Sequence, residues 1–277
     1  MFLVLSIITL IFFFPIIKNI QLSTTDAQFV EASKFIGLQN YLNVLQDYNF
    51  WHAAIITLIY TTIYTISIFI VGIITALLLD KAKGRRKTIF RTFFVLPFAI
   101  PDTAAALVFL WMLDYQFGIL NYFLNFLHLT KVPVLWLSSS PLLSLITVIS
   151  VEIWRFFPLH TLIIYAAMQN IPKELYEAAE IDGAGGIAKF FKITIPQLKR
   201  ILSILFVLTI IWCFRRFTMI WLLTRGGPAR GTETIVIQLY KYAFPFNKMS
   251  YASTIGMILL LITIVLAVVY FKYSKQE

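Results

Sequence analysis

Six long apolar blocks limit what this chain can fold into more than any other feature. They cover residues 2–17, 53–79, 92–113, 142–168, 201–224 and 252–271. A helix needs about 20 apolar residues to cross the hydrocarbon core of a bilayer, and five blocks reach that length. The first block is shorter, but it lacks the basic start and the small-residue cleavage site of a signal peptide, so we expect it to span as well. The sequence therefore predicts an all-α integral membrane protein with six transmembrane helices.

The composition supports this class and excludes others. Of the 277 residues, 60% are hydrophobic and 13% are charged, whereas about a quarter of the residues in a soluble domain are charged. A single cysteine, Cys213, and three scattered histidines exclude a disulfide framework and a zinc motif. The net charge of +10 is typical of cytoplasmic loops rich in Lys and Arg, so we do not expect nucleic acid as a partner.

Loop charges predict the orientation of the spans. Residues 80–91 hold the densest run of Lys and Arg, which places this loop in the cytoplasm. Six spans then place both termini and the polar segment 169–200 on the same side. Residues 18–52, 114–141 and 225–251 face outward, although the last of these carries four basic residues and is a mild exception.

The polar segment 169–200 interrupts two apolar blocks. Pro172 suits the first turn of a helix, and Gly183 is typical of the position after a helix C-cap. We expect a second short helix over residues 187–193. The alanines 178 and 179 give the first helix a small-residue face, which fits either a docking surface or a solvated connection. A G-x-G-x-x-A match at residues 183–188 is not expected to bind a dinucleotide, because no strand precedes it.

This segment resembles the EAA loop of ABC importer permeases. Glu177-Ala178-Ala179, Gly183, Ile193 and Pro196 fall at the spacings of that loop, with Ile195 in place of its usual leucine. Residues 35–41 (FIGLQNY) resemble the F-x-G-L-x-N-Y motif of carbohydrate permeases, Gly118 and Asn121 fit a following G-x-x-N, and residues 223–228 (LTRGGP) resemble L-T-x-G-G-P. The resemblance covers almost the whole chain and is to the maltose-permease type.

The resemblance implies a type I ABC importer permease fold in which the EAA loop is a cytoplasmic coupling helix. By this resemblance, the residues expected to contact an ATPase subunit are Glu177, Ala178, Ala179, Asp182 and Gly183. The chain has no G-x-x-x-x-G-K-[ST] loop, so we expect ATP and Mg to bind the partner ATPase and this chain to be a transport subunit with no cofactor and no enzymatic activity.

The resemblance also implies an assembly in the plasma membrane of a bacterium or archaeon. The expected partners are a second, homologous permease subunit in a heterodimer, a cytoplasmic ATPase dimer, an extracellular solute-binding protein, a sugar and membrane lipid. We expect residues 1–52 to form the first span and an external loop, residues 53–271 to form the transmembrane domain, and residues 272–277 to form a cytoplasmic tail.

Ionisable residues inside the spans are costly and usually functional. Trp212, Arg215, Arg216 and Met219 recur at i, i+3, i+4 and i+7, which predicts one shared helical face. An indole beside guanidinium groups suits a sugar, and the resemblance places these four residues in the substrate pathway.

The fourth block adds Trp154, Arg155, Phe156 and Leu159 to that pathway by the same resemblance. Arg155 is expected either to contact substrate or to pair with Glu152, three residues earlier. Asp102, just after Pro101, is expected to mark a helix bend.

The function predicted is translocation of a sugar or oligosaccharide, and the three intramembrane arginines raise the hypothesis that it is anionic. The alternatives are another solute such as glycerol phosphate, an ion-coupled secondary transporter, and an intramembrane enzyme. A secondary transporter usually has inverted repeats and relay carboxylates, and no repeat is seen. An enzyme would need a catalytic constellation that the spans do not contain.

Overall fold

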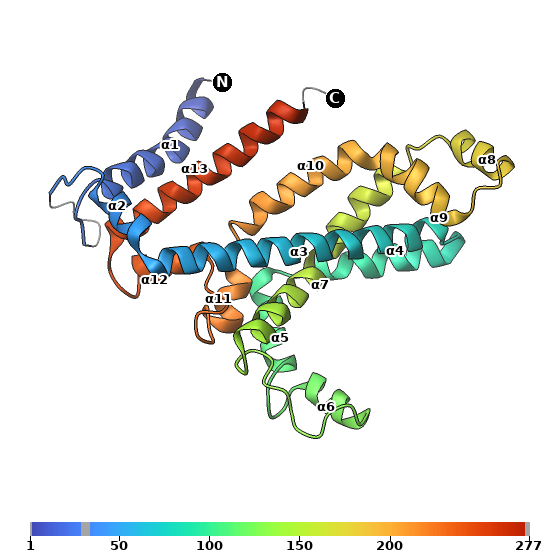
Figure 1. Ribbon diagram of the computed structural model, residues 1–277, viewed down its shortest axis with the longest axis horizontal. Coiled ribbons are helices and arrows are strands. Elements are labelled where there is room, and N and C mark those ends of the chain that lie inside the picture. The colour runs from blue at the N-terminus through green and yellow to red at the C-terminus, as the bar shows by residue number, and fades with distance from the viewer. Residues whose placement is uncertain (1, 29–33, 275–277) are drawn as a thin grey trace. The chain divides into compact units, whose positions relative to one another are not determined.

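The computed structural model describes residues 2–28 and 34–274 (Figure 1). Within these ranges the regular elements are helices, apart from one isolated bridge between Thr25 and Phe35, which confirms the all-α class. The chain divides into two compact units. One comprises Met1–Ile59, Leu137–Ser144 and Cys213–Glu277, and the other comprises Tyr60–Trp136 and Leu145–Trp212.

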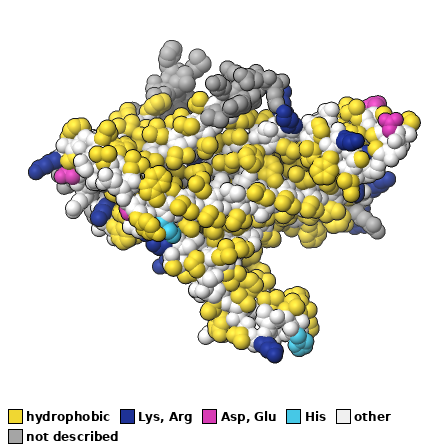
Figure 2. All heavy atoms as spheres, in the orientation of Figure 1, with side chains coloured by type: hydrophobic (Ala, Val, Ile, Leu, Met, Phe, Trp, Pro, Cys, Tyr) yellow, Lys and Arg dark blue, Asp and Glu magenta, His cyan; other side chains and the backbone are white. Residues whose placement is uncertain are grey.

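Four helical runs in the described part are long and apolar enough to cross a membrane. They are α3 (Tyr48–Lys81), α7 (Pro141–Met168), the run Gly186–Cys213, and Met249–Val268 within α13 (Met249–Ser274). Hydrophobic side chains cover much of the face seen in Figure 2. The expected first span lies in α1 (Phe2–Ser23). The side chains of residues 2–10 and 12 lie outside the described part, so the count of six spans stays a prediction.

The expected third span, residues 92–113, is not one straight helix. It consists of α4 (Gly84–Ala99) and α5 (Asp102–Met112), which meet at an angle of 95°. Ile100 is extended, with ψ of 130°, as the residue before a proline tends to be, and Pro101 has no N–H to continue the helical ladder. Asp102 opens α5, which confirms its expected place at a bend.

In the first unit, α1 runs beside α13, and both α2 (Gln39–Gln46) and α12 (Ile235–Ala243) pack on α13 (Figure 1). Apolar side chains from these elements and from the start of α3 form a core of Val44, Phe50, Ala53, Ile235 and Ile255. Asn40, the asparagine of the F-x-G-L-x-N-Y match, is buried and donates to the carbonyl oxygens of Ser23 and Thr25, at 3.0 and 2.7 Å. Its amide thus ties the end of α1 to α2.

A carboxylate joins α12 and α13 to the loop before α3. Asp47 accepts hydrogen bonds from the Tyr251 hydroxyl at 2.6 Å, the Asn49 N–H at 2.8 Å and the Tyr242 hydroxyl at 3.2 Å. Burial alone would raise the pKa of Asp47, but the hydrogen bonds from Tyr251, Asn49 and Tyr242 outweigh it and hold the pKa below its ordinary value.

This network predicts acid sensitivity. Because the pKa of Asp47 is lower in the folded state, its contribution to stability is present above the unfolded-state pKa of about 3.9 and is lost as pH falls through the folded-state value. Asp47→Asn should lower the free energy of unfolding at pH 6 by roughly 1–2 kcal/mol and flatten its pH dependence below pH ~4. Thermal unfolding in detergent from pH 3 to 6 measures both. Equal acid dependence in the wild type and the variant would rule out this role.

The second unit contains the rest of α3, α4 to α6 (Ile119–Phe126), most of α7 and the chain from α8 (Lys173–Ile181) to Trp212. Its core gathers Ala76, Ile164, Met168, Leu198 and Leu205. Gly72 lets α3 approach α7, since a Cβ there would lie 2.9 Å from Cβ of His160. The His160 ring in turn bonds through Nε2 to the Thr209 hydroxyl, at 2.9 Å. A buried polar contact therefore joins α7 to α10 (Ile195–Cys213).

The G-x-x-N match has a structural role in the hairpin around α6. Oδ1 of Asn121 accepts the N–H of Val134 at 3.0 Å and Nε1–H of Trp136 at 3.1 Å, while its Nδ2 donates to the Val134 carbonyl at 3.0 Å. Gly118 is required because a Cβ there would lie 2.2 Å from the Asp114 carbonyl oxygen. One buried amide and one glycine thus close the hairpin.

Candidate functional site

The polar segment 169–200 forms the helix and stop that its sequence predicts. α8 begins after Pro172 and ends at Ile181. Gly183 then adopts φ of +73°, its N–H bonds to the Glu180 carbonyl at 3.0 Å, and the Ala184 N–H bonds to the Ala179 carbonyl at 2.8 Å. These two bonds are those of a Schellman motif, which satisfies the last carbonyls of the helix.

The second helix expected over residues 187–193 is not separate. α9 (Gly186–Lys189), a π-helical turn η1 (Phe190–Thr194) and α10 continue without a break to Cys213. Pro196 therefore lies inside the helical run and not before it. The wide turn immediately precedes the proline, where a missing N–H interrupts the regular ladder.

The surface of this loop combines small, acidic and apolar side chains. Glu177, Ala178, Asp182 and Gly183 are exposed, while Ala179 is half-buried. Sequence reasoning missed Ile181, Ile187 and Phe191, which are 88%, 79% and 64% exposed. Large apolar residues inside a polar segment were the available signal. Such exposed apolar groups at a loop tip are typical of a protein-binding surface.

Three polar contacts brace this loop. The Tyr176 hydroxyl bonds to the Thr194 hydroxyl at 2.9 Å, and Nε2 of Gln169 donates to the Asp80 carboxylate of α3 at 2.7 Å. Nζ of Lys189 lies 2.5 Å from the Glu180 carboxylate, and this hydrogen bond holds the pKa of Glu180 below its ordinary value. α8 is thus linked to η1 and α9, and the end of α7 to α3, by defined hydrogen bonds.

Arg155 clamps the bend between α4 and α5. Its Nε lies 2.7 Å from Oδ1 of Asp102, and its Nη1 donates to the Phe98 carbonyl at 3.1 Å. The guanidinium group also lies 4.7 Å from the centre of the Phe156 ring. In the described part of the chain the ion pair of Arg155 is therefore with Asp102. The Glu152 carboxylate accepts a hydrogen bond from the Tyr60 hydroxyl at 2.7 Å.

The clamp predicts a loss of stability when its charge is removed. Arg155→Met should lower the free energy of unfolding by roughly 2 kcal/mol. This is less than the roughly 3–5 kcal/mol lost when one partner of a fully buried ion pair is removed, because the Asp102 side chain is 41% exposed. Thermal unfolding in detergent measures the change. The double variant Asp102→Leu/Arg155→Met should recover part of the loss, since it leaves no charge without its partner. An Arg155→Met protein as stable as the wild type would contradict the clamp.

The other predicted residues of α7 pack around the same bend. The Trp154 ring meets Phe109 of α5 edge-on, with centroids 5.0 Å apart, and Phe156 meets Phe98 of α4 at 6.0 Å. Leu159 is half-buried. The structure thus brings Trp154, Arg155 and Phe156 together against the bent pair.

The helical face predicted for the fifth span is wrong. α10 ends at Cys213, and α11 (Thr218–Thr224) is a separate helix. Trp212 lies in the last turn of α10, Arg215 and Arg216 lie in the break, and Met219 in α11 is 3% exposed. Two adjacent guanidinium groups are costly in a continuous apolar helix, and the break leaves Arg215 exposed.

Sequence reasoning also missed an aromatic group next to this break. The Phe217 and Trp221 rings stack with centroids 5.8 Å apart, and Tyr240 of α12 lies 4.8 Å from Phe217 and 4.6 Å from Trp221. The i, i+4 spacing of Phe217 and Trp221 was the available signal. Aromatic faces and guanidinium groups are both suited to a sugar carrying negative charge.

Comparison with known proteins places this geometry in a family. Residues 68–274 match the family described as binding-protein-dependent transport system inner membrane component. The chain is 35% identical to the probable ABC transporter permease protein YurN of Bacillus subtilis, over 100% of this chain and 97% of that protein. It is 31% identical to the trehalose/maltose transport system permease protein MalF of Thermococcus litoralis, over 98% of this chain and 90% of that protein.

A solved structure has the same fold. It is the crystal structure of a bacterial ABC transporter involved in the import of the acidic polysaccharide alginate, with a TM-score of 0.86, 22% identity, and coverage of 100% of this chain and 94% of that one. The family match covers most of the chain and includes both the 169–200 loop and the broken fifth span. The chain belongs to the binding-protein-dependent transport system inner membrane components, the membrane-embedded permease subunits of ABC transporters.

Proposed function

We propose that this chain is the permease subunit of an ATP-driven importer that translocates a sugar or oligosaccharide delivered by an extracellular binding protein. The observation that carries the proposal is the braced loop 169–200, with its Schellman stop at Gly183 and its exposed small and apolar residues. The match to permeases of binding-protein-dependent transport systems supports it.

In this proposal the loop 169–200 transmits the movement of the ATPase partner to the membrane spans. A helix can transmit the movement of a partner only if it is held rigidly to the spans behind it. The bonds from Tyr176 to Thr194 and from Gln169 to Asp80 provide that attachment. In this proposal ATP and Mg bind the cytoplasmic ATPase dimer, and Glu177, Ala178, Ala179, Asp182 and Gly183 contact it.

A sugar is the substrate that the broken fifth span fits best. Arg215 is exposed and comes two residues before Phe217, whose ring stacks on Trp221 of α11. Two relatives bear on this assignment. One is named a trehalose/maltose permease. The other is named a sulfoquinovosyl glycerol transport system permease protein, SmoG of Agrobacterium fabrum, which is 28% identical over 98% of this chain and 87% of that protein. An anionic sugar is the finer proposal.

The partners follow from the same assignment. They are a second permease subunit, the ATPase dimer and the binding protein, with both termini of this chain in the cytoplasm. One solved structure of this fold is a bacterial alginate ABC transporter in complex with an alginate pentasaccharide-bound periplasmic protein.

Co-purification tests the proposal. The tagged chain, expressed with its native partners, should retain an ATPase chain in detergent, and the reconstituted complex should take up sugar only with ATP and binding protein present. Uptake driven by a proton gradient, with no ATPase bound, would instead favour a secondary transporter.

A further inference from the structure

A cavity with a volume of about 590 Å³ lies where α3 ends and α4 begins. Its lining residues come from the last turn of α3, the connection and the first turns of α4. They are Leu78, Lys81, Ala82, Lys83, Arg85 and Phe90. The described lining thus combines an apolar wall with three cations and no acid.

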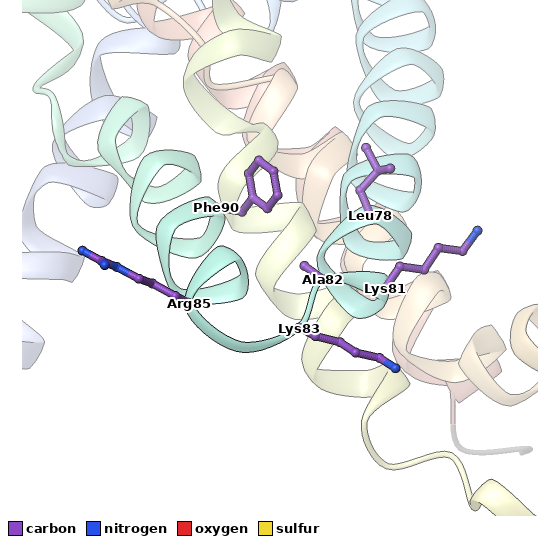
Figure 3. Close-up of a pocket in the computed structure, with 6 residues that line it drawn as sticks. All are labelled: Leu78, Lys81, Ala82, Lys83, Arg85 and Phe90. Atoms are coloured by element: carbon purple, nitrogen blue, oxygen red, sulfur yellow. The ribbon is translucent and has the colours of Figure 1, made fainter.

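Figure 3 shows how these side chains are arranged. Leu78 of α3 and Phe90 of α4 stand on opposite helices, on the apolar side of the opening. Lys81 and Lys83 extend to one side of the connection, and Arg85 extends to the other. A ligand in the opening would therefore meet apolar surface at Leu78 and Phe90 and positive charge at Lys81 and Lys83.

No side chain in the described part of the chain pairs with these three cations. Lys81, Lys83 and Arg85 are exposed, and in the described part of the chain their side chains form no ion pair or hydrogen bond. The neighbouring acid, Asp80, accepts a hydrogen bond from Gln169. Their charge is therefore available to an anion from outside the chain.

We propose that this cavity binds an anionic glycerophospholipid. Its phosphate would be held by Lys81 and Lys83, which extend to the same side of the connection, through charge-assisted hydrogen bonds. Its acyl chain would follow Leu78 and Phe90 along the span. The position at the end of a membrane-spanning helix brings the cavity to headgroup depth, and basic pockets beside such helices are suited to anionic headgroups. A soluble phosphate would use the cations but not the apolar wall.

Native mass spectrometry of the purified chain in a nonionic detergent tests this proposal. Phosphatidylglycerol and phosphatidylcholine with identical acyl chains are titrated separately. The wild type should bind phosphatidylglycerol at least tenfold more tightly. Lys81→Gln/Lys83→Gln should weaken that binding roughly fivefold for each cation removed. Phe90→Ala should weaken it severalfold without changing the charge.

The matched control is Lys173→Gln/Lys192→Gln, which removes two exposed lysines of the 169–200 region and should leave lipid binding unchanged. Equal binding of the two lipids, or an equal loss in the control, would overturn the site. Displacement of phosphatidylglycerol by millimolar inorganic phosphate or glycerol 3-phosphate would overturn the lipid as its ligand. A size-exclusion profile matching the wild type shows that each variant is folded.

Discussion

Replacing Ile181 with aspartate is expected to weaken docking of the ATPase partner by roughly 30-fold, the effect of losing one interface hot spot of about 2 kcal/mol. Ile181 is the last residue of α8 and is 88% exposed. It adjoins the small-residue surface of Ala178, so a partner that closes on that surface would bury it. Aspartate would place a charge where an apolar group is desolvated.

The measurement is the affinity of the purified ATPase for the permease complex, read together with ATP-dependent uptake. Deleting Glu177 to Gly183 should abolish both ATPase binding and ATP-dependent uptake, and it should leave sugar capture by the external binding protein intact. Val132→Asp is the matched control, because Val132 is an exposed apolar residue, 68% exposed, in the hairpin of α6 expected on the opposite side of the membrane. Unchanged affinity with Ile181→Asp would remove this residue from the interface.

Local patterns predicted the parts of the fold that local chemistry determines. Gly183 ends α8 because glycine adopts φ of +73° without the steric cost that a Cβ would add. Pro101 breaks the third span through its own ring. The apolar blocks located α3, α7 and α13 because about 20 apolar residues fix a span by length alone.

Contacts between distant residues were not predictable in this way. Arg155 has Glu152 one turn away on its own helix, yet its partner is Asp102 on α5, since the bend carries that carboxylate to α7. The wrong helical face of the fifth span has a related cause. An i, i+3, i+4 pattern assumes that the helix continues, and the helix stops at Cys213, just before the two arginines that made the pattern look functional.

The break at Arg215 and Arg216 leads to the second large prediction. Arg215→Gln should raise the half-saturating concentration of a carboxylate-bearing oligosaccharide by roughly 10- to 100-fold, the equivalent of one hydrogen bond between charged groups. A neutral sugar of the same length should be affected far less, because it offers Arg215 no charge. Arg215→Lys should fall between the two, since it keeps the charge and loses the paired donors.

The measurement is ATP-driven uptake by reconstituted complexes, with uronate-bearing and neutral oligosaccharides in competition. It compares the effect of each Arg215 variant on the charged and the neutral sugar. Lys248→Gln is the control, because Lys248 is an exposed cation after α12, in the segment expected to face outward, and is not part of the break. Its effect measures long-range attraction alone, which added salt should screen. A contact at Arg215 would persist at high salt and would discriminate between the two sugars. Equal effects of Arg215→Gln on both sugars would assign the residue to the structure of the break, and uptake of neutral sugar alone by the wild type would refute the anionic substrate.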